Sequence, residues 1–113
     1  MLSCTDPRER IVPPDVRLSF APGTTVTSPD TLVGSAYAFD ADGLEFFFWT
    51  LWSSDGSLRL DSTEAIAGTT EFSRQLTFQI PAGLVSGTVL HVLARASDVA
   101  GYRGRDSTAF TIP

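Results

Sequence analysis

The chain lacks several residue types, and each absence excludes a class of structure or modification. Its 113 residues include a single Cys, so no intramolecular disulfide can form, and no Asn, so N-linked glycosylation is excluded. No apolar run approaches the roughly 20 residues of a membrane-spanning helix. The net charge of −5, in a chain whose eight basic residues are all Arg, argues against nucleic-acid binding, for which a basic patch is typical.

The residues that are present predict one folded domain. Hydrophobic residues make up 42% of the chain and charged residues 19%, which excludes an intrinsically disordered protein. A chain of this length buries about 65% of its unfolded surface on folding, enough for a core of its own. Residues 1–13 are charged, aperiodic and end at a Pro-Pro pair, so we predict a flexible N-terminal tether there and a domain over residues 14–113.

Apolar residues alternate with polar ones between turns that contain Gly, Pro or Asp. This period of two predicts strands over residues 16–20, 32–39, 44–52, 58–60, 72–80, 89–97 and 108–112. Residues 61–70 and 98–105 are predicted to be loops, and no segment has a sustained helical period. About seven strands at turn spacings of roughly 8 to 12 residues are typical of an all-β antiparallel sandwich.

Four short motifs occur in order along the chain. A Pro-Pro start leads to Pro22-Gly23, the pattern A-x-D-x-x-G occurs at 38–43 and again at 96–101, and Phe78–Gly83 leads into a corner. With them, residues 13–113 resemble the bacterial immunoglobulin-like domains of secreted and surface-anchored proteins, although Tyr102 stands where that family usually has Asn. The resemblance implies an immunoglobulin-like β-sandwich of about seven strands, acting as a structural, adhesion or assembly module in the periplasm, the outer membrane or at the cell surface.

The single cysteine lies close to the start of the chain. Met1-Leu2-Ser3-Cys4 resembles the end of a bacterial lipoprotein processing site, in which the Cys becomes lipidated, although Met1 stands where Leu is preferred. Cys4 is therefore a candidate lipid anchor, and the domain's only expected link to a membrane. The alternative is a free thiol in the tether.

Three aspartates lie within the two A-x-D-x-x-G motifs and form a candidate calcium site. Asp40, Asp42 and Asp98 would leave the core at the same end of a sandwich, and calcium prefers carboxylate and carbonyl oxygens. The alternative is that each Asp accepts hydrogen bonds from the backbone of its own turn, as Asx-turn residues do without any metal.

The segment 44–52 is rich in aromatic residues on both faces of the predicted strand. Alternation places Phe46, Phe48 and Trp52 on one face, and Phe47, Trp49 and Leu51 on the other. A sandwich strand needs only one apolar face, so the second is a candidate partner surface. We expect that surface to be Phe47, Trp49 and Leu51, because they share the parity of the charged Glu45. The alternative is a cover formed by residues 61–70 or by the tether.

The sequence predicts no catalytic residue and no enzyme. His91 is the one His and falls in the middle of a predicted strand, no G-x-S-x-G motif is present, and a second Cys for a zinc site is lacking. The expected function is that of a non-enzymatic extracytoplasmic module that binds a protein partner or a neighbouring domain. Two alternatives remain: a carbohydrate-binding module in which Trp49, Tyr37 or Tyr102 stacks on sugar rings, and a calcium-stiffened spacer.

Overall fold

The computed structural model describes residues 12–113, which form seven strands and no helix. The strands are β1 (Asp15–Ser19), β2 (Asp30–Phe39), β3 (Leu44–Ser53), β4 (Arg59–Ala65), β5 (Glu71–Ile80), β6 (Val89–Asp98) and β7 (Arg103–Thr111). In this part of the chain no helix exists that could cross a membrane. Most of the predicted tether, including the candidate lipid anchor Cys4, lies outside the described residues.

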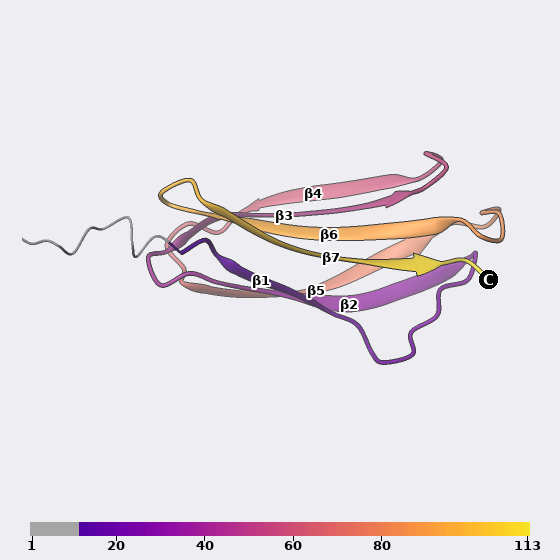
Figure 1. The fold of residues 1–113 in the computed structure, drawn as a ribbon, viewed down its shortest axis with the longest axis horizontal. Coiled ribbons are helices and arrows are strands. Elements are labelled where there is room, and N and C mark those ends of the chain that lie inside the picture. Colours follow the sequence, from indigo (N-terminus) through magenta and orange to yellow (C-terminus); the bar gives the residue numbers. More distant parts are fainter. Residues whose placement is uncertain (1–11) are drawn as a thin grey trace, which may run out of the picture.

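The strands form two antiparallel sheets that face each other, which makes the molecule an all-β sandwich as predicted (Figure 1). One sheet has the order β1-β2-β5, and the other has the order β4-β3-β6-β7. The central pairs are β2 with β5 and β3 with β6, and each pair is in register over most of its length. Strands 2 and 5 thus lie opposite strands 3 and 6 across the core.

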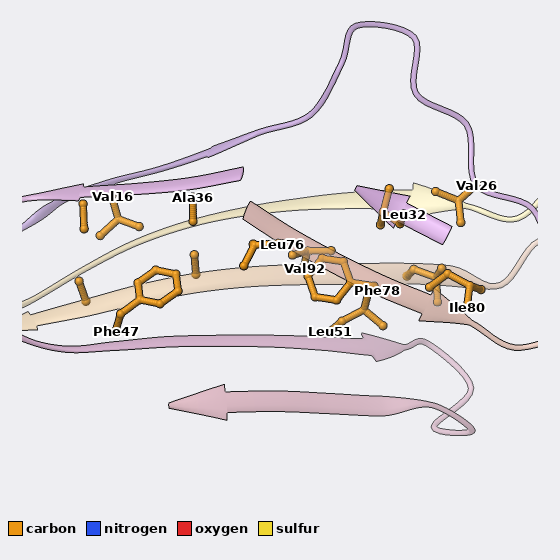
Figure 2. Packing of buried hydrophobic residues seen from close by; sticks show 14 of the residues in the cluster. Val16, Val26, Leu32, Ala36, Phe47, Leu51, Leu76, Phe78, Ile80 and Val92 are labelled. Atoms are coloured by element: carbon orange, nitrogen blue, oxygen red, sulfur yellow. The ribbon is translucent and has the colours of Figure 1, made fainter. Parts of the chain in front are cut away.

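The core lies between the sheets and is formed by alternate residues of both (Figure 2). On β6 the small and branched side chains of Leu90, Val92, Ala94 and Ala96 all point inward, as the alternation predicts. The largest fully buried side chains are Phe47, Phe78, Leu44, Leu51, Leu90, Val26 and Val92. Burying a side chain of this size contributes about 1.5 to 3 kcal/mol to folding, so this set accounts for much of the stability.

Two strands are longer than the sequence predicted. β4 continues through Asp61 and Glu64 to Ala65, where a loop was expected, and β7 begins at Arg103, inside the loop predicted over 98–105. Both are edge strands, in which every second residue faces water and the remainder need not be large and apolar. The polar residues of these two edge strands therefore led to the incorrect prediction of loops.

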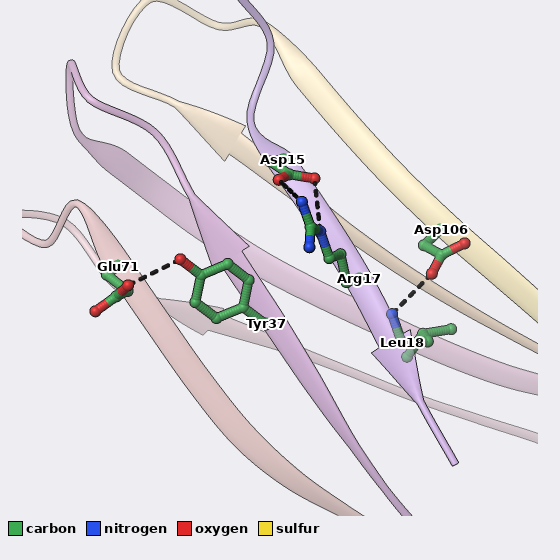
Figure 3. Close-up of polar contacts among 6 residues, drawn as sticks. All are labelled: Asp15, Arg17, Leu18, Tyr37, Glu71 and Asp106. Carbon is green, nitrogen blue, oxygen red and sulfur yellow. Dashed lines mark hydrogen bonds and ion pairs between the residues drawn. The ribbon is translucent and has the colours of Figure 1, made fainter. Parts of the chain in front are cut away.

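Polar contacts join the two sheets along both of their open sides. On one side the backbone N–H of Leu18 in β1 donates to Oδ2 of Asp106 in β7, at 2.8 Å (Figure 3). On the other side Nε of Arg74 in β5 donates to Oε2 of Glu64 in β4, at 3.0 Å. Within the smaller sheet, the hydroxyl of Tyr37 donates to Glu71 at 2.8 Å (Figure 3).

Candidate functional site

The face of β3 that was predicted to be exposed points into the core, and the face that was predicted to be buried points outward. Phe47 and Leu51 have an exposed fraction of 0%, so they are core residues and cannot form a partner surface. Trp49 is half-buried and packs edge-on against Phe78, with 5.0 Å between ring centroids. The prediction of Phe47, Trp49 and Leu51 as an interaction face is therefore wrong, and Trp49 is the tryptophan of this strand that packs against the core.

A β-bulge at the start of β3 explains the error. The pairing of β3 with β6 shifts between Leu44 and Phe46, so one extra residue, Glu45, is inserted there. Leu44 and Phe47 consequently both face the core although they are three positions apart. The parity of Glu45 does not continue along the strand, and it gives no information about the faces beyond the bulge.

The side chains that do face outward form an aromatic row on the larger sheet. Phe46 is 45% exposed, and Phe48 and Trp52 are half-buried on the same face. Thr50 lies between them and is buried, because its hydroxyl donates to the carbonyl of Leu60 at 3.1 Å. We call the solvent-facing side of the β4-β3-β6-β7 sheet, with this row along β3, the outer face.

Cations flank the aromatic row on the neighbouring strands. The registers place five charged residues on the outer face: Arg59 and Asp61 of β4, Arg95 of β6, and Arg103 and Arg105 of β7. The guanidinium carbon of Arg95 lies 4.9 Å from the ring centroid of Phe48, a cation–π arrangement. His91 stacks on Trp52, with ring centroids 5.0 Å apart and an angle of 18° between the planes. His91 therefore lies on the outer face, within β6, where the sequence predicted a strand.

Two shallow hollows lie along the row, one on each side of the Phe48–Arg95 pair. The first has a volume of about 220 Å³ and is lined by Phe46, Phe48, Thr63, Arg95, Ala96, Ser97 and Arg103. The second has a volume of about 250 Å³ and is lined by Phe48, Thr50, Trp52, Arg59, Leu93 and Arg95. The outer face therefore combines aromatic surface with guanidinium groups in one continuous strip.

The predicted calcium site is not formed. Among residues 12–113 no group of three or more His, Cys, Asp or Glu side chains is placed to hold a metal ion. Asp40 and Asp98 are almost fully buried, at 4% and 2% exposure, whereas Asp42 points into solvent. The three carboxylates do not converge, because only two of them turn back toward the core.

The Asx-turn interpretation is confirmed for Asp40 and Asp98, but not for Asp42. Oδ1 of Asp98 accepts hydrogen bonds from the backbone N–H groups of Ala100 and Tyr102, at 2.9 and 2.8 Å. Oδ1 of Asp40 accepts one from Asp42 at 2.8 Å. Each side chain thus holds the turn that follows its own strand, which is a structural role.

Asp40 is nevertheless unusual, because its second carboxyl oxygen, Oδ2, is buried without a hydrogen-bond partner. Burial raises the pKa of Asp40 above its ordinary value. The hydrogen bond from the backbone of Asp42 opposes this effect in part, and the nearby carboxyl group of Asp98 raises the pKa further. A hollow of about 510 Å³ borders Asp40, Asp42 and Asp15, next to Val12 and Pro13 at the start of the described residues.

The other predicted stacking residues do not meet. Tyr37 lies on the outside of the smaller sheet, where it bonds to Glu71, and Tyr102 is exposed in the turn before β7. The residues missed by sequence reasoning are Phe46, Phe48 and Trp52. Thr50 could have identified them, because it is the one polar residue between 46 and 52 and shares their parity.

Comparison with known proteins adds no assignment to this geometry. No protein-family profile matches the chain, and no curated protein sequence matches it, so the function is inferred from the fold and the outer face.

Proposed function

We propose that this chain is a non-enzymatic immunoglobulin-like module of a bacterial surface protein or assembly, which works outside the cytoplasm and binds a partner protein through its outer face. The observation that carries the proposal is the row of Phe46, Phe48 and Trp52 on the open side of the larger sheet. Aromatic and Arg residues are the types enriched at protein interfaces, and here they occur together on one face.

The fold supports the immunoglobulin-like part of the proposal. The central strands β2 and β5 oppose β3 and β6, and the two A-x-D motifs end β2 and β6 in matching Asx turns. One departure concerns β4, which pairs with β3, whereas constant-type immunoglobulin domains place their fourth strand in the other sheet. The moved strand widens the β3 sheet and so enlarges the outer face.

The rigidity of this face favours binding. The row lies on a central strand that is paired on both sides, with β4 and with β6, and its reverse side is packed into the core. Side chains held in this way lose little conformational entropy when a partner covers them. A partner protein would therefore meet a surface that is already formed.

A carbohydrate-binding module remains the second candidate, and a different observation favours it. Trp52 is flanked by the polar side chains of Arg59 and His91, and neighbours of that kind are suited to sugar hydroxyls. A glycan array separates the candidates, because a carbohydrate module retains particular sugars, whereas a protein-binding module retains none and forms a complex with its partner in light scattering after size exclusion.

The proposal is tested by site-specific photo-crosslinking in the native host. A photoreactive amino acid replaces Phe46 on the outer face, and the matched control replaces Val33 on the smaller sheet, since both residues are 45% exposed. We expect a discrete crosslinked protein from position 46 and none from position 33. Equal crosslinking from both positions contradicts a specific protein-binding face.

A further inference from the structure

We infer that the partner segment bound by the outer face is acidic and extended: its carboxylates pair with Arg95, Arg103 and Arg105, and its apolar side chains contact Phe46 and Phe48. This inference rests on the proposed function, because it names the chemistry of the partner that the same face binds. It follows from the distribution of charge, from the state of the guanidinium groups and from the spacing of the row.

Charge on the described part of the molecule is segregated. The chain carries eight basic and thirteen acidic residues, and its net charge is −5. The outer face nevertheless holds four Arg residues and only one acidic residue, Asp61. When the basic residues of an acidic protein lie on one face, that face attracts anions although the net charge of the whole protein is negative.

Three of these four arginines have no carboxylate partner among residues 12–113. Arg59 pairs with Asp61 at 3.4 Å, and Arg17 and Arg74, which lie away from this face, also have acidic partners. Arg95, Arg103 and Arg105 have no carboxylate oxygen within 4.0 Å in the same part of the chain. Within residues 12–113, therefore, no carboxylate competes with a bound anion for these guanidinium groups.

Two of the unpaired arginines are placed directly opposite each other. Arg95 of β6 pairs in register with Arg105 of β7, and like charges at such a position destabilise a sheet. A carboxylate bound between them removes the repulsion and gains hydrogen bonds to both groups. The pair therefore favours the anion-bound state over the free state.

Arg95 is also oriented before any ligand arrives. Its guanidinium lies over the ring of Phe48, which restricts the side chain and leaves the N–H groups at its edge free to form two parallel bonds with a carboxylate. Arg95 covers one face of Phe48 and His91 covers one face of Trp52, so these rings offer less open surface to a stacked sugar than two free aromatic side chains would.

The spacing of the row matches an extended peptide. Phe46, Phe48, Thr50 and Trp52 are successive outward residues of one strand, which repeat about every 7 Å. An extended segment laid along β3 presents its own alternate side chains with the same repeat. The two hollows on either side of Arg95 then accept apolar side chains, while acidic residues meet the arginines.

The test uses fluorescence anisotropy on the complete chain with two labelled peptides: a Glu-Val peptide, Glu-Ser-Val-Ser repeated twice, and a Lys-Val peptide, Lys-Ser-Val-Ser repeated twice. Alternate residues of an extended peptide share one face, so the charged and the Val side chains of each peptide lie on the same side. We expect the Glu-Val peptide to bind and the Lys-Val peptide not to bind. The double substitution Arg103→Gln with Arg105→Gln should weaken binding at least about tenfold, because two charge-assisted contacts are lost. Arg17→Gln, on the other sheet, is the matched control and should have no effect. Added salt should weaken binding further.

The double variant removes one member of the Arg95–Arg105 pair, so we expect it to fold at least as stably as the parent chain, and thermal unfolding monitors this. Equal binding of both peptides, or an equal loss from Arg17→Gln, overturns the inference. So does tighter binding of polygalacturonate than of the Glu-Val peptide, because the anionic ligand is then a glycan.

The crosslinking and peptide experiments together distinguish the two proposals. If position 46 crosslinks to a protein but the Glu-Val peptide does not bind, the proposal of an acidic partner is wrong and the proposal of a protein-binding face stands. If neither occurs, both proposals fail.

Discussion

Asp40 and Asp98 are buried at the same end of the sandwich, where the backbone N–H of Val99, next to Asp98, donates to the carbonyl of Gly43, in the turn after Asp40, at 3.1 Å. Each carboxyl group accepts backbone hydrogen bonds within its own turn, so each stabilises one of the two turns that meet there. The repeated A-x-D-x-x-G pattern therefore corresponds to a real spatial pairing. Its consequences are thermodynamic and can be measured.

Asp40→Asn should change how stability depends on pH. Burial, and then Asp98, raise the pKa of Asp40 in the folded chain above the unfolded value of about 3.9. The folded state therefore binds the proton more tightly, and the stabilisation is present below that value and lost as pH rises through the raised pKa. We expect the parent chain to lose stability relative to Asp40→Asn over this window, as measured by urea unfolding from about pH 3 to about pH 8.

Asp55 provides a control, because its pKa is shifted in the opposite direction from that of Asp40. Hydrogen bonds from the Ser53 side chain, and then from Ser57, lower the pKa of Asp55 to about 2. Its contribution is present above the ordinary pKa of Asp and is lost as pH falls toward about 2. In the same titration Asp55→Asn should therefore lose stability at neutral pH and approach the parent in acid. If both variants shift the profile in one direction, the assignment of Asp40 is wrong.

Asp98→Ala should be strongly destabilising. The substitution leaves the backbone N–H groups of Ala100 and Tyr102 without their acceptor in a partly buried turn. Two such losses cost about 2 to 4 kcal/mol in the free energy of unfolding. Asp42→Ala, at an exposed position of the other turn, is the comparison and should cost less than about 0.5 kcal/mol. Chemical denaturation of both variants measures the difference, and equal costs would contradict the Asx-turn role.

Phe47→Ala and Phe46→Ala should have very different effects although the residues are adjacent. Phe47 is in the core, and its truncation should cost about 3 to 5 kcal/mol. Phe46 is on the outer face, and its truncation should cost about 1 kcal/mol or less while it reduces partner binding. Thermal unfolding of the pair is sufficient. A larger loss of stability from Phe46→Ala would mean that the bulge is absent.

Gly104→Ala tests the close approach of the chain before β1 to the edge strand β7. A Cβ atom at position 104 would overlap the backbone carbonyl of Pro14, which has no room to move aside, so we expect a cost of about 1 to 3 kcal/mol. Gly34→Ala is the matched variant. The atoms nearest to its Cβ would be those of the Phe20 ring, a side chain and not backbone, so we expect a smaller cost. A cost at Gly34 that equals the cost at Gly104 would contradict the contact with Pro14.

The sequence was sufficient to predict the sandwich and the strands over 72–80 and 89–97, which correspond to β5 and β6, because apolar and polar residues alternate over most of their length. It was not sufficient for β3. Both faces of that strand are apolar, so composition does not distinguish core from surface, and a single inserted residue at Glu45 exchanges them. The position of a bulge depends on the partner strand, which is not visible in local sequence.

The calcium prediction failed for a related reason. The chain order brings Asp40 and Asp98 to one end, but the direction of each side chain depends on its turn, and both carboxyl groups fold back onto backbone N–H groups. The arginine pair on the outer face could not be predicted either, because Arg95 and Arg105 lie opposite each other only through the register of β6 with β7.

The two polar contacts along the open sides of the sandwich also limit how copies of this domain can associate. Glu64 with Arg74, and Asp106 with the backbone of Leu18, place charged side chains beside the unpaired edges of all four edge strands. Inward-pointing charges at such positions discourage strand addition by a neighbouring molecule. Copies crowded on one surface, or linked in series, should therefore remain separate folding units instead of exchanging strands, and this keeps each outer face free to act independently.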